Sequence, residues 1–539
     1  MTRTGTVVIV GAGINGLIAG ALLARQGRRV VVLERSDRAG GLVRTDELTL
    51  PGYLHDTFSS WHGTFLSGPA WPLLRSELEA RGLAWRRAED LVTATVRRDG
   101  AVAMLHRDPR TTARQLRPGD EEAYVALVRQ IHRLAPHLGR ILGAEPRSAT
   151  SARALLGIAR STGVHGISEL LRTTVSGARN WLDRQFDGDE IDAIVAPWLL
   201  HAGMAPGDAG GPIAAMMLLG GLHAGGVPVL TGGSGRLTDA LVDIIEASGG
   251  EVRLGAEVTG IEVSGGTVTG VLVHGAHQPA GCVLASVTPD ALYNQLLPGD
   301  AVPLPVRTEA RRFRRGRGAM QIHVALTRPL AWRDPRLAQV PLIHLSDGST
   351  SVSLACAQAE AGLLPSRPTV VVGQQHVLDP SRVPSGAAAL WLQLQEVPSH
   401  LRGDAADPSA RLDGWTEAIS SRYVDRVVDL IDHHAPGTRD RVAAVVALTP
   451  HDLARHDVNA VGGDPYGGAA TLDQSFLWRP LSSTPAHRTA LVGLWHIGAS
   501  THPGPGLSGA SAVAAAADIL AGTPGARVRR WRPPSRALA

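Results

Sequence analysis

The sequence predicts an α/β fold with at least two domains, and three observations lead to that expectation. The chain has 539 residues, about twice the length at which a single hydrophobic core usually stops growing. With 44% hydrophobic and 19% charged residues, it has the composition of a folded globular protein. A short apolar strand, a glycine-rich turn and a helix follow one another at the N-terminus, and two later blocks repeat this order.

The N-terminal block reads as a strand, a helix and a second strand. Residues 6–10 form a β-branched run without polar alternation, which is typical of a strand buried on both faces. Residues 11–26 carry apolar side chains at helical spacing and lead to Gly27, a residue suited to a left-handed helix cap. Residues 30–33 repeat the buried-strand pattern. These elements predict a βαβ unit with a parallel sheet.

Two later blocks extend this pattern of strands and helices. The elements that we expect there are a helix over 237–247, strands over 251–254, 257–263 and 267–273, a strand over 490–497 and a helix over 511–521. The long stretches between the blocks have mixed helical and strand patterns with many proline and glycine residues.

The turn after the first strand has the spacing of a dinucleotide-binding motif, and residues 11–16 read G-A-G-I-N-G. The first glycine permits a tight turn, the second lets the backbone approach a pyrophosphate, and the third lets the helix pack on the strand. Free N–H groups at the helix start favour the phosphates. Glu34 ends the second strand, where a carboxylate can accept hydrogen bonds from ribose hydroxyls. This combination predicts a Rossmann-type domain.

Three further segments carry a resemblance to a known family. Residues 37–45 read D-R-A-G-G-L-V-R-T, residues 51–62 read P-G-Y-L-H-D-T-F-S-S-W-H, and residues 494–509 read L-W-H-I-G-A-S-T-H-P-G-P-G-L-S-G. With the first turn, they resemble the flavin-binding segments of the phytoene desaturase and amine oxidase superfamily, above all its phytoene-desaturase-like branch. Shorter likenesses at 196–204, 228–235 and 314–320 extend the resemblance over most of the chain.

The resemblance implies FAD as the cofactor and a discontinuous domain organisation. We expect a Rossmann-type FAD-binding domain built from residues 1–75, 228–299 and 485–523, a mixed α+β substrate domain inserted as residues 76–227 and 300–484, and a disordered tail over 524–539.

The resemblance also indicates which residues contact FAD. They are Gly11, Gly13, Ile14, Asn15, Gly16, Glu34, Arg35, Gly41, Leu42, Arg44, Val258, Gly498, Ser500, Gly506 and Leu507. In that superfamily the closing glycine-rich turn reaches the flavin ring, and N–H groups at a helix start can stabilise charge on a reduced flavin. The closing segment departs from the family pattern because it lacks an acidic residue used toward the ribityl chain or pyrophosphate, so the contacts of Ser500 and Thr501 are open.

The absence of lysine favours one of two flavin chemistries. The sequence contains no lysine, so a Schiff base is excluded. Many amine oxidases of the superfamily hold a water against the flavin with a lysine, so the sequence favours C–C desaturation over amine oxidation. Only two cysteines occur, Cys282 and Cys356, which excludes a dithiol redox centre and fits a reducing cytoplasm.

We therefore expect an FAD-dependent dehydrogenase or desaturase that acts on an apolar or alicyclic small molecule by hydride transfer. Electrons would leave to oxygen, a quinone or another acceptor. A flavin amine or amino-acid oxidase and a non-catalytic FAD-binding partner protein stay open as alternatives.

Histidines within the family-like motifs are candidates for the proton transfer, because histidine titrates near neutral pH. They are His62, His201, His496 and His502. His62 is the first choice as a catalytic residue and His201 the second. A dense run at 451–457 contains two histidines and two aspartates but no cysteine or H-E-x-x-H frame, so it predicts a solvated helix or loop and no metal site.

The charge of the chain indicates which classes of partner we expect. The formal charge is only +4, so no nucleic-acid partner is expected. Arginine clusters at 311–317 and 527–532 are interpreted as a solvated face and tail, and they leave peripheral membrane contact open. The longest apolar run, residues 210–222, is too short to cross a bilayer. The oligomeric state is not indicated.

Overall fold

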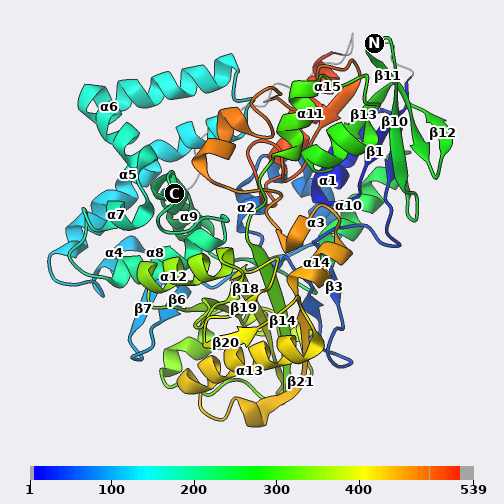
Figure 1. Cartoon of the computed structure of the whole chain (residues 1–539). Helices are drawn as coiled ribbons and strands as arrows, with labels where there is room; N and C mark the ends of the chain where they lie inside the picture. The colour runs from blue at the N-terminus through cyan, green and yellow to red at the C-terminus, as the bar shows by residue number, and fades with distance from the viewer. Residues whose placement is uncertain (1–4, 485, 523–539) are drawn as a thin grey trace.

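The computed structural model describes residues 5–484 and 486–522 (Figure 1). The tail expected over 524–539 lies outside the described residues. Two large sheets organise the chain, one parallel and one mostly antiparallel, with helices packed on both. The predicted α/β fold is confirmed.

The first sheet is parallel and has five strands. In spatial order these are β22 (Leu494–His496), β13 (Cys282–Ala285), β1 (Val7–Val10), β2 (Val30–Leu33) and β9 (Glu251–Arg253). Alternate side chains of β1 point into two different hydrophobic clusters, so this strand is buried on both faces. Its strands come from three distant parts of the chain, which meet in this sheet.

Helices cover one face of this sheet and a small β-meander covers the other. The helices are α1 (Ile14–Ala24), α10 (Gly235–Ala247) and α15 (Ala510–Ala521), and the meander is β10 (Val258–Ser264), β11 (Thr267–Val273) and β12 (Ala276–Pro279). Helix α1 begins at Ile14 and not at Gly11, because Gly11 has a φ of +95° and Gly13 is extended. The strand expected over 490–497 is shorter than expected, because Gly493 has a φ of +87° and turns the chain.

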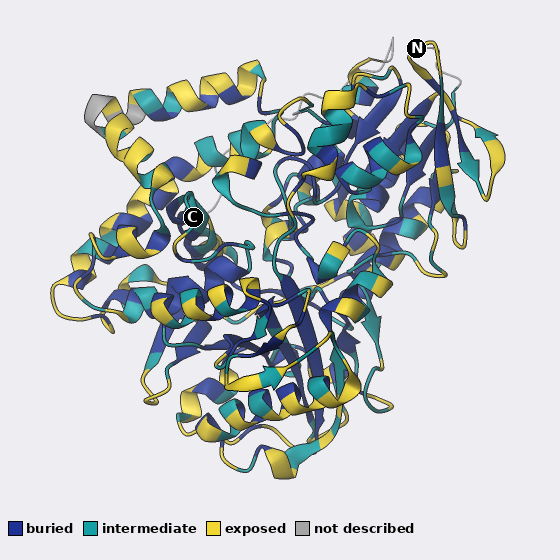
Figure 2. Ribbon diagram, viewed as in Figure 1, coloured by how far each residue is buried: buried dark blue, intermediate teal, exposed yellow. Residues whose placement is uncertain are grey.

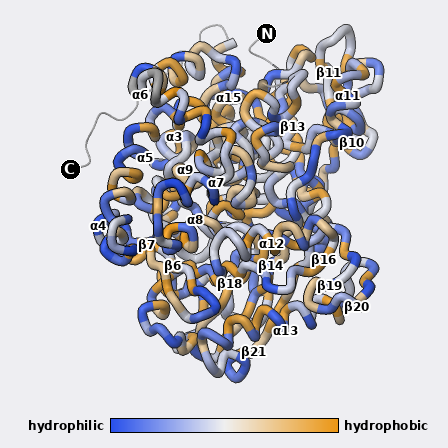
Figure 3. The backbone as a smooth tube through the Cα atoms, turned by 60° about the vertical axis from the view of Figure 1, so that its left-hand side comes forward, coloured by the Kyte–Doolittle hydropathy of each residue, from blue (hydrophilic) through white to orange (hydrophobic). Residues whose placement is uncertain are grey.

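The second sheet has seven strands. Their spatial order is β21 (Val442–Leu448), β14 (Gly318–Leu326), β18 (Ala388–Val397), β17 (Val370–Gly373), β15 (Leu342–Leu345), β6 (Leu91–Val96) and β7 (Val102–His106). Their pairings are antiparallel except that of β15 with β6. The hydrophobic residues of β14 and β18 are visible in the lower half of Figure 3.

Helix α13 (Glu417–His434) packs on one face of the seven-stranded sheet. The opposite face packs against α8 (Glu190–Leu200) and a layer formed by α5 (Asp120–Leu142) and α9 (Gly211–Gly225). The long helix α6 (Ala149–Val175) extends away from the body, is interrupted at Gly163 and carries many exposed residues (Figure 2). Of the helices that the structure describes, none has both the length and the apolarity needed to cross a membrane.

The remaining elements are short. The helices are α2 (Gly63–Ser67), α3 (Trp71–Ala80), α4 (Pro109–Ala113), α7 (Ala178–Leu182), α11 (Leu304–Arg311), α12 (Ser349–Glu360) and α14 (Pro450–His456). The strands are β3 (Thr45–Asp46), β4 (His55–Asp56), β5 (Trp85–Arg86), β8 (Val229–Leu230), β16 (Leu363–Leu364), β19 (Gly403–Asp404) and β20 (Asp407–Arg411).

A buried ionic network around Arg382 connects the loop before β18 of the seven-stranded sheet with the segments around β4 and β8. The guanidinium of Arg382 donates to Asp56 Oδ2 at 2.6 Å, to Asp379 Oδ2 at 3.1 Å and to the Leu230 carbonyl at 2.6 Å. Asp56 also accepts hydrogen bonds from Ser60 Oγ and the Ser234 amide. Arg382 therefore ties the loop before β18 to the segments around β4 and β8.

Candidate active site

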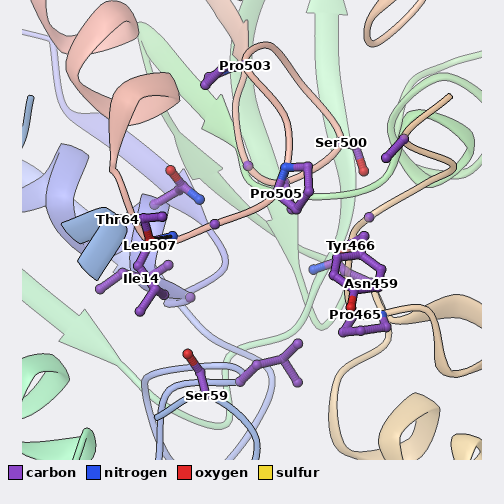
Figure 4. A pocket seen from close by; sticks show the side chains of 18 of the residues that line it. Ile14, Ser59, Thr64, Asn459, Pro465, Tyr466, Ser500, Pro503, Pro505 and Leu507 are labelled. Carbon is purple, nitrogen blue, oxygen red and sulfur yellow. Dashed lines mark hydrogen bonds between the residues drawn. The ribbon is translucent and has the colours of Figure 1, made fainter. Parts of the chain in front are cut away.

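A cavity of about 1310 Å³ is lined by residues from both sheets and from α5, α6 and α9. Pockets for a single small ligand typically measure roughly 300–1,000 Å³, so this cavity has room for a dinucleotide and a second molecule. Figure 4 shows Ile14, Thr64 and Leu507 on one side of it and Asn459 and Tyr466 on the other. The cavity is therefore the candidate site for both cofactor and substrate.

The first glycine turn leaves space where a pyrophosphate would lie. No side chain caps the N-terminus of α1, so its first amides are free of a side-chain acceptor. A Cβ on Gly13 would meet no atom within 4 Å, whereas a Cβ on Gly16 would lie 2.1 Å from the Gly11 carbonyl oxygen. Gly13 therefore borders open space and Gly16 packs the helix on the strand, which suits an anion at the helix start.

The acidic residue and the second glycine pair lie at the same end of the cavity. Glu34 accepts hydrogen bonds from the Ala12 amide at 2.8 Å and the Ser36 amide at 2.9 Å, and it lines the cavity. The Gly40 amide donates to the Ala12 carbonyl, which brings Gly41 against the first turn. Buried Nε of Arg44 has no hydrogen-bond partner among the described residues, and burial lowers the pKa of this side chain. An unpaired guanidinium nitrogen fits a phosphate-bearing ligand.

The closing segment reaches the cavity from α15. Gly498 and Gly506 have φ values of +111° and +118°, and no side chain caps α15. The Leu507 amide donates to Thr64 Oγ1 at 3.3 Å, which ties the segment to α2. Ser500 lines the cavity, while buried Thr501 donates to the Gly498 carbonyl.

The cavity brings together all but one of the residues expected to contact the cofactor. The residues that line it are Gly11, Gly13, Ile14, Asn15, Glu34, Arg35, Gly41, Leu42, Arg44, Val258, Gly498, Ser500, Gly506 and Leu507. Gly16 is the exception, because it is buried in the contact of α1 with β1. The free amides, the open space at Gly13 and the unpaired Arg44 nitrogen are what an FAD pyrophosphate requires.

His62 lies in the core and does not line the cavity, which argues against the catalytic role expected for it. Trp85 Nε1 donates to His62 Nδ1 at 3.1 Å, so His62 Nε2 carries the proton and donates to Ser234 Oγ at 3.1 Å. The side chain is fully buried, and burial lowers its pKa to about 4. With both nitrogens occupied and no opening to the cavity, this histidine packs α2 against β5 and is not placed to act as a base.

His201 does line the cavity. Its Nε2 shares a hydrogen bond of 3.0 Å with Nε2 of His344, and its ring stacks on Trp198 with centroids 4.6 Å apart. Burial lowers the pKa of His201 to about 3. This histidine is therefore uncharged near neutral pH.

The other two histidine candidates differ in position. His496 is buried outside the cavity lining and hydrogen-bonds the Val287 carbonyl. His502 lines the cavity and hydrogen-bonds the Ile141 carbonyl. Burial lowers the pKa of both to about 4.

The run at 451–457, expected to be solvated, instead contributes to the site. His456 hydrogen-bonds the Gly41 carbonyl at 3.1 Å, and Asp457 lies close enough to Gly41 to contact a Cβ placed there. Both residues line the cavity, as does Asn459, whose amide donates to the Ser286 carbonyl. Within residues 5–484 and 486–522, no group of His, Cys, Asp or Glu side chains is arranged to hold a metal.

The arginine cluster at 311–317 is only partly solvated. Arg314 pairs with Asp473, and Arg317 pairs with Glu360 while donating to the Gly203 carbonyl. The second cluster lies outside the described residues.

The buried His62 gives a pH prediction. An unfolded histidine binds a proton below about pH 6.5, whereas folded His62 binds one only near pH 4, so the unfolding free energy falls as the pH drops through this window. We expect His62→Gln to reduce the loss of unfolding free energy between pH 7 and pH 5.5 by about 1 kcal/mol. Urea denaturation at the two pH values measures this. The control Leu354→Gln, at a position 56% exposed, should lose as much as the wild type, and an equal loss in His62→Gln would contradict the prediction.

The chain is similar to known proteins over most of its length. The family model described as flavin containing amine oxidoreductase matches residues 14–515. Pyridine nucleotide-disulfide oxidoreductase domain-containing protein 2 of Rattus norvegicus is 26% identical over 547 residues, covering 94% of this chain and 91% of that protein. Phytoene dehydrogenase of Streptomyces griseus is 27% identical over 526 residues, covering 93% and 92%.

Solved structures share the fold. An oxidoreductase from Methanosarcina mazei superposes with a TM-score of 0.62 at 15% identity, covering 95% of this chain and 100% of that chain. Putrescine oxidase bound to putrescine superposes with a TM-score of 0.59 at 16% identity, covering 96% and 99%.

These matches confirm the predicted superfamily and FAD as its cofactor. Since the family model spans most of the sequence, this chain belongs to the flavin containing amine oxidoreductase family and is an FAD-dependent oxidoreductase.

Proposed function

We propose that this chain is an FAD-dependent dehydrogenase that desaturates a C–C bond of an apolar or alicyclic small molecule. The observation that carries the proposal is an apolar chamber in the part of the cavity lined by α5, α6 and α9. Its lining includes Leu138, Ile141, Leu142, Leu155, Ile158, Leu170, Ile213, Met217, Leu218 and Leu222. A chamber with this surface favours an apolar substrate by the hydrophobic effect.

The charges of the cavity support this choice over amine oxidation. The acidic side chains that line it are Glu34, Asp457, Glu257 and Asp290. Glu34 and Asp457 lie at the first glycine turns, Glu257 precedes Val258, and Asp290 follows β13. None lies on α5, α6 or α9. A protonated amine in the apolar chamber would therefore lose its hydration without a carboxylate partner, which is costly.

The residues of this chain would position the substrate and exclude water. FAD, when bound, supplies the hydride acceptor. The side chains of α5, α6 and α9 would hold the apolar body of the substrate beside the closing segment 498–507, which lines the same cavity. Neutral His201 and His502 are the histidines of the expected set that face this space. Oxygen, a quinone or another acceptor would then take the electrons.

Anaerobic reduction of the holoenzyme tests this function. Alicyclic and lipophilic compounds should bleach the flavin absorbance and yield products two hydrogens lighter, while primary amines should not. Bleaching by amines with release of an aldehyde would contradict the proposal in favour of an oxidase. If no compound of either class reduces the flavin, and no oxidant reoxidises photoreduced flavin efficiently, a non-catalytic FAD-binding protein is favoured.

A charge placed in the apolar chamber should impair substrate reduction. We expect Ile213→Asp to slow bleaching by the best alicyclic substrate by at least about tenfold, because an unpaired carboxylate there must stay hydrated and displaces the substrate. Its FAD content should equal that of the wild type, since Ile213 lies on α9, apart from the glycine turns. Stopped-flow absorbance measures the rate. Leu354→Asp, at a position 56% exposed on α12, is the control, and an equal rate in Ile213→Asp would contradict the role of the chamber.

We also propose peripheral contact with a membrane through α6. Helix α6 lines the chamber with Leu155 and Leu170 and exposes other apolar side chains, among them Leu171 at 63% and Val175 at 68%. We expect the double variant Leu171→Glu, Val175→Glu to reduce co-sedimentation with vesicles of phosphatidylcholine and phosphatidylglycerol by at least about fivefold. Leu354→Glu is the matched surface control. Equal sedimentation of the double variant and the wild type would contradict this contact.

A further inference from the structure

A row of aligned residues crosses the seven-stranded sheet on the face toward the cavity. His344 on β15 pairs with Val371 on β17, Val371 pairs with Gln393 on β18, and Gln393 pairs with Gln321 on β14. Side chains at paired positions point to the same face of a sheet. Val371 packs with the cluster under α8 and α9, which identifies this face. Three of the four side chains are polar.

Two of these polar side chains each make one hydrogen bond within the protein, while Gln321 Oε1 and His344 Nδ1 are buried without a partner among the described residues. The Gln321 amide donates to the Leu392 carbonyl at 2.9 Å. His344 is fully buried and its Nε2 shares the hydrogen bond with His201. His344 thereby fixes the ring of His201 against Trp198 at the wall of the cavity.

Several polar atoms at the cavity wall have no partner among the described residues, and His201 and Gln393 present two of these groups. Nδ1 of His201 and the side-chain amide of Gln393 make no hydrogen bond to any residue in the described part of the chain. The neighbouring Gln395 differs in its nitrogen, which donates to Tyr466 Oη at 3.0 Å, while its Oε1 has no partner among the described residues. A polar group beside an apolar chamber gains a partner only from a ligand or water.

A chain of hydrogen bonds connects the end of α8 with the closing segment 498–507. Tyr466 Oη donates to the carbonyl of Leu200, the residue before His201, at 2.6 Å. Arg479 donates to the Tyr466 carbonyl at 3.1 Å and to the Ala499 carbonyl at 2.7 Å. These hydrogen bonds link the end of α8, next to His201, to the closing segment 498–507, and both line the same cavity.

We propose that His201 and Gln393 form a subsite for an uncharged oxygen group of the substrate, an alcohol or a ketone. The inference rests on the proposed function, since it specifies the substrate as a mainly apolar molecule with one such group. An imidazole and an amide offer both a donor and an acceptor, which a hydroxyl can use together and a carbonyl in part. Neither residue supplies a charge that would compensate an ammonium or carboxylate.

Binding to the holoenzyme tests the subsite without turnover. Cyclohexanol, cyclohexanone, cyclohexane and cyclohexylamine are titrated at pH 7 while the flavin absorbance spectrum is followed. We expect the alcohol or the ketone to bind about tenfold more tightly than cyclohexane, as one or two uncharged hydrogen bonds allow, and the protonated amine to bind no more tightly than cyclohexane. The stronger of the two oxygen compounds identifies the preferred group. No preference over cyclohexane, or a preference for the amine, would overturn the subsite.

Two variants test whether His201 and Gln393 cause the preference for the oxygen compound over cyclohexane. His201→Phe and Gln393→Leu should each lower it to about threefold or less while leaving the affinity for cyclohexane unchanged, and His400→Phe at the surface should keep it. If His201→Phe does not fold, the result for Gln393→Leu alone tests the subsite. A preference that survives in a folded variant overturns the assignment to that residue. Because the readout is binding, the subsite can hold even where anaerobic reduction refutes the proposed desaturation.

Discussion

Gly13→Val is expected to yield a folded protein that no longer retains FAD. Gly13 has an extended backbone that any residue can adopt, and a Cβ there meets no atom of the described chain within 4 Å. A valine side chain would occupy the space at the start of α1 where the pyrophosphate must approach the free amides. We expect FAD affinity to fall by at least about 100-fold, which corresponds to about 2.8 kcal/mol.

Thermal unfolding with and without FAD measures this effect. The cofactor should raise the wild-type melting temperature and leave that of Gly13→Val unchanged, because a ligand stabilises only the protein that binds it. Gly16→Ala is the informative contrast, since its Cβ would clash with the Gly11 carbonyl and destabilise the apoprotein itself. A Gly13→Val protein that is as yellow as the wild type would contradict the assignment of this turn to the cofactor.

Arg382→Met should be among the most destabilising single substitutions in this protein. It removes the cation that pairs with Asp56 and Asp379, and the side chains of both aspartates are at most 3% exposed. The cation is what holds the pKa of Asp56 below its usual value against complete burial. Breaking a buried ion pair by removing one partner costs about 3–5 kcal/mol, because the remaining charge is left without compensation.

Urea denaturation at pH 7 measures this loss. Arg336→Met is the matched control, because Arg336 pairs with Asp334 at the surface and such pairs contribute about 0–1 kcal/mol. A loss in Arg382→Met no greater than that in Arg336→Met would show that the network around β4 and β8 does not hold the two regions together.

The elements that the sequence predicted well are those with strong local signals. Residues 30–33 and 267–273 form strands with the expected bounds, because β-branched runs between glycine or polar residues specify buried strands. The glycine turns were predictable because positive φ at Gly11 and close packing at Gly16 leave few alternatives to glycine. The closing helix α15 was predictable because an alanine-rich run follows a glycine-rich turn.

The site residues that sequence reasoning missed depend on long-range packing. Asp457 and His456 looked like solvated charges, yet they contact Gly41, more than four hundred residues away in the chain. His62 shared a motif with cavity residues, but α2 turns its ring toward Trp85 and Ser234. His344 carries no motif at all, and only the register of β15 brings it to His201. A pattern read along one strand or helix contains no information on such partners.

The most direct test of this account is to release and identify the cofactor of the purified wild-type protein. The free amides of α1, the acid at the end of β2 and the closing turn before α15 together specify one dinucleotide with its flavin in the cavity. We predict one FAD per chain. A colourless protein that refuses added FAD and binds NAD instead would contradict the account.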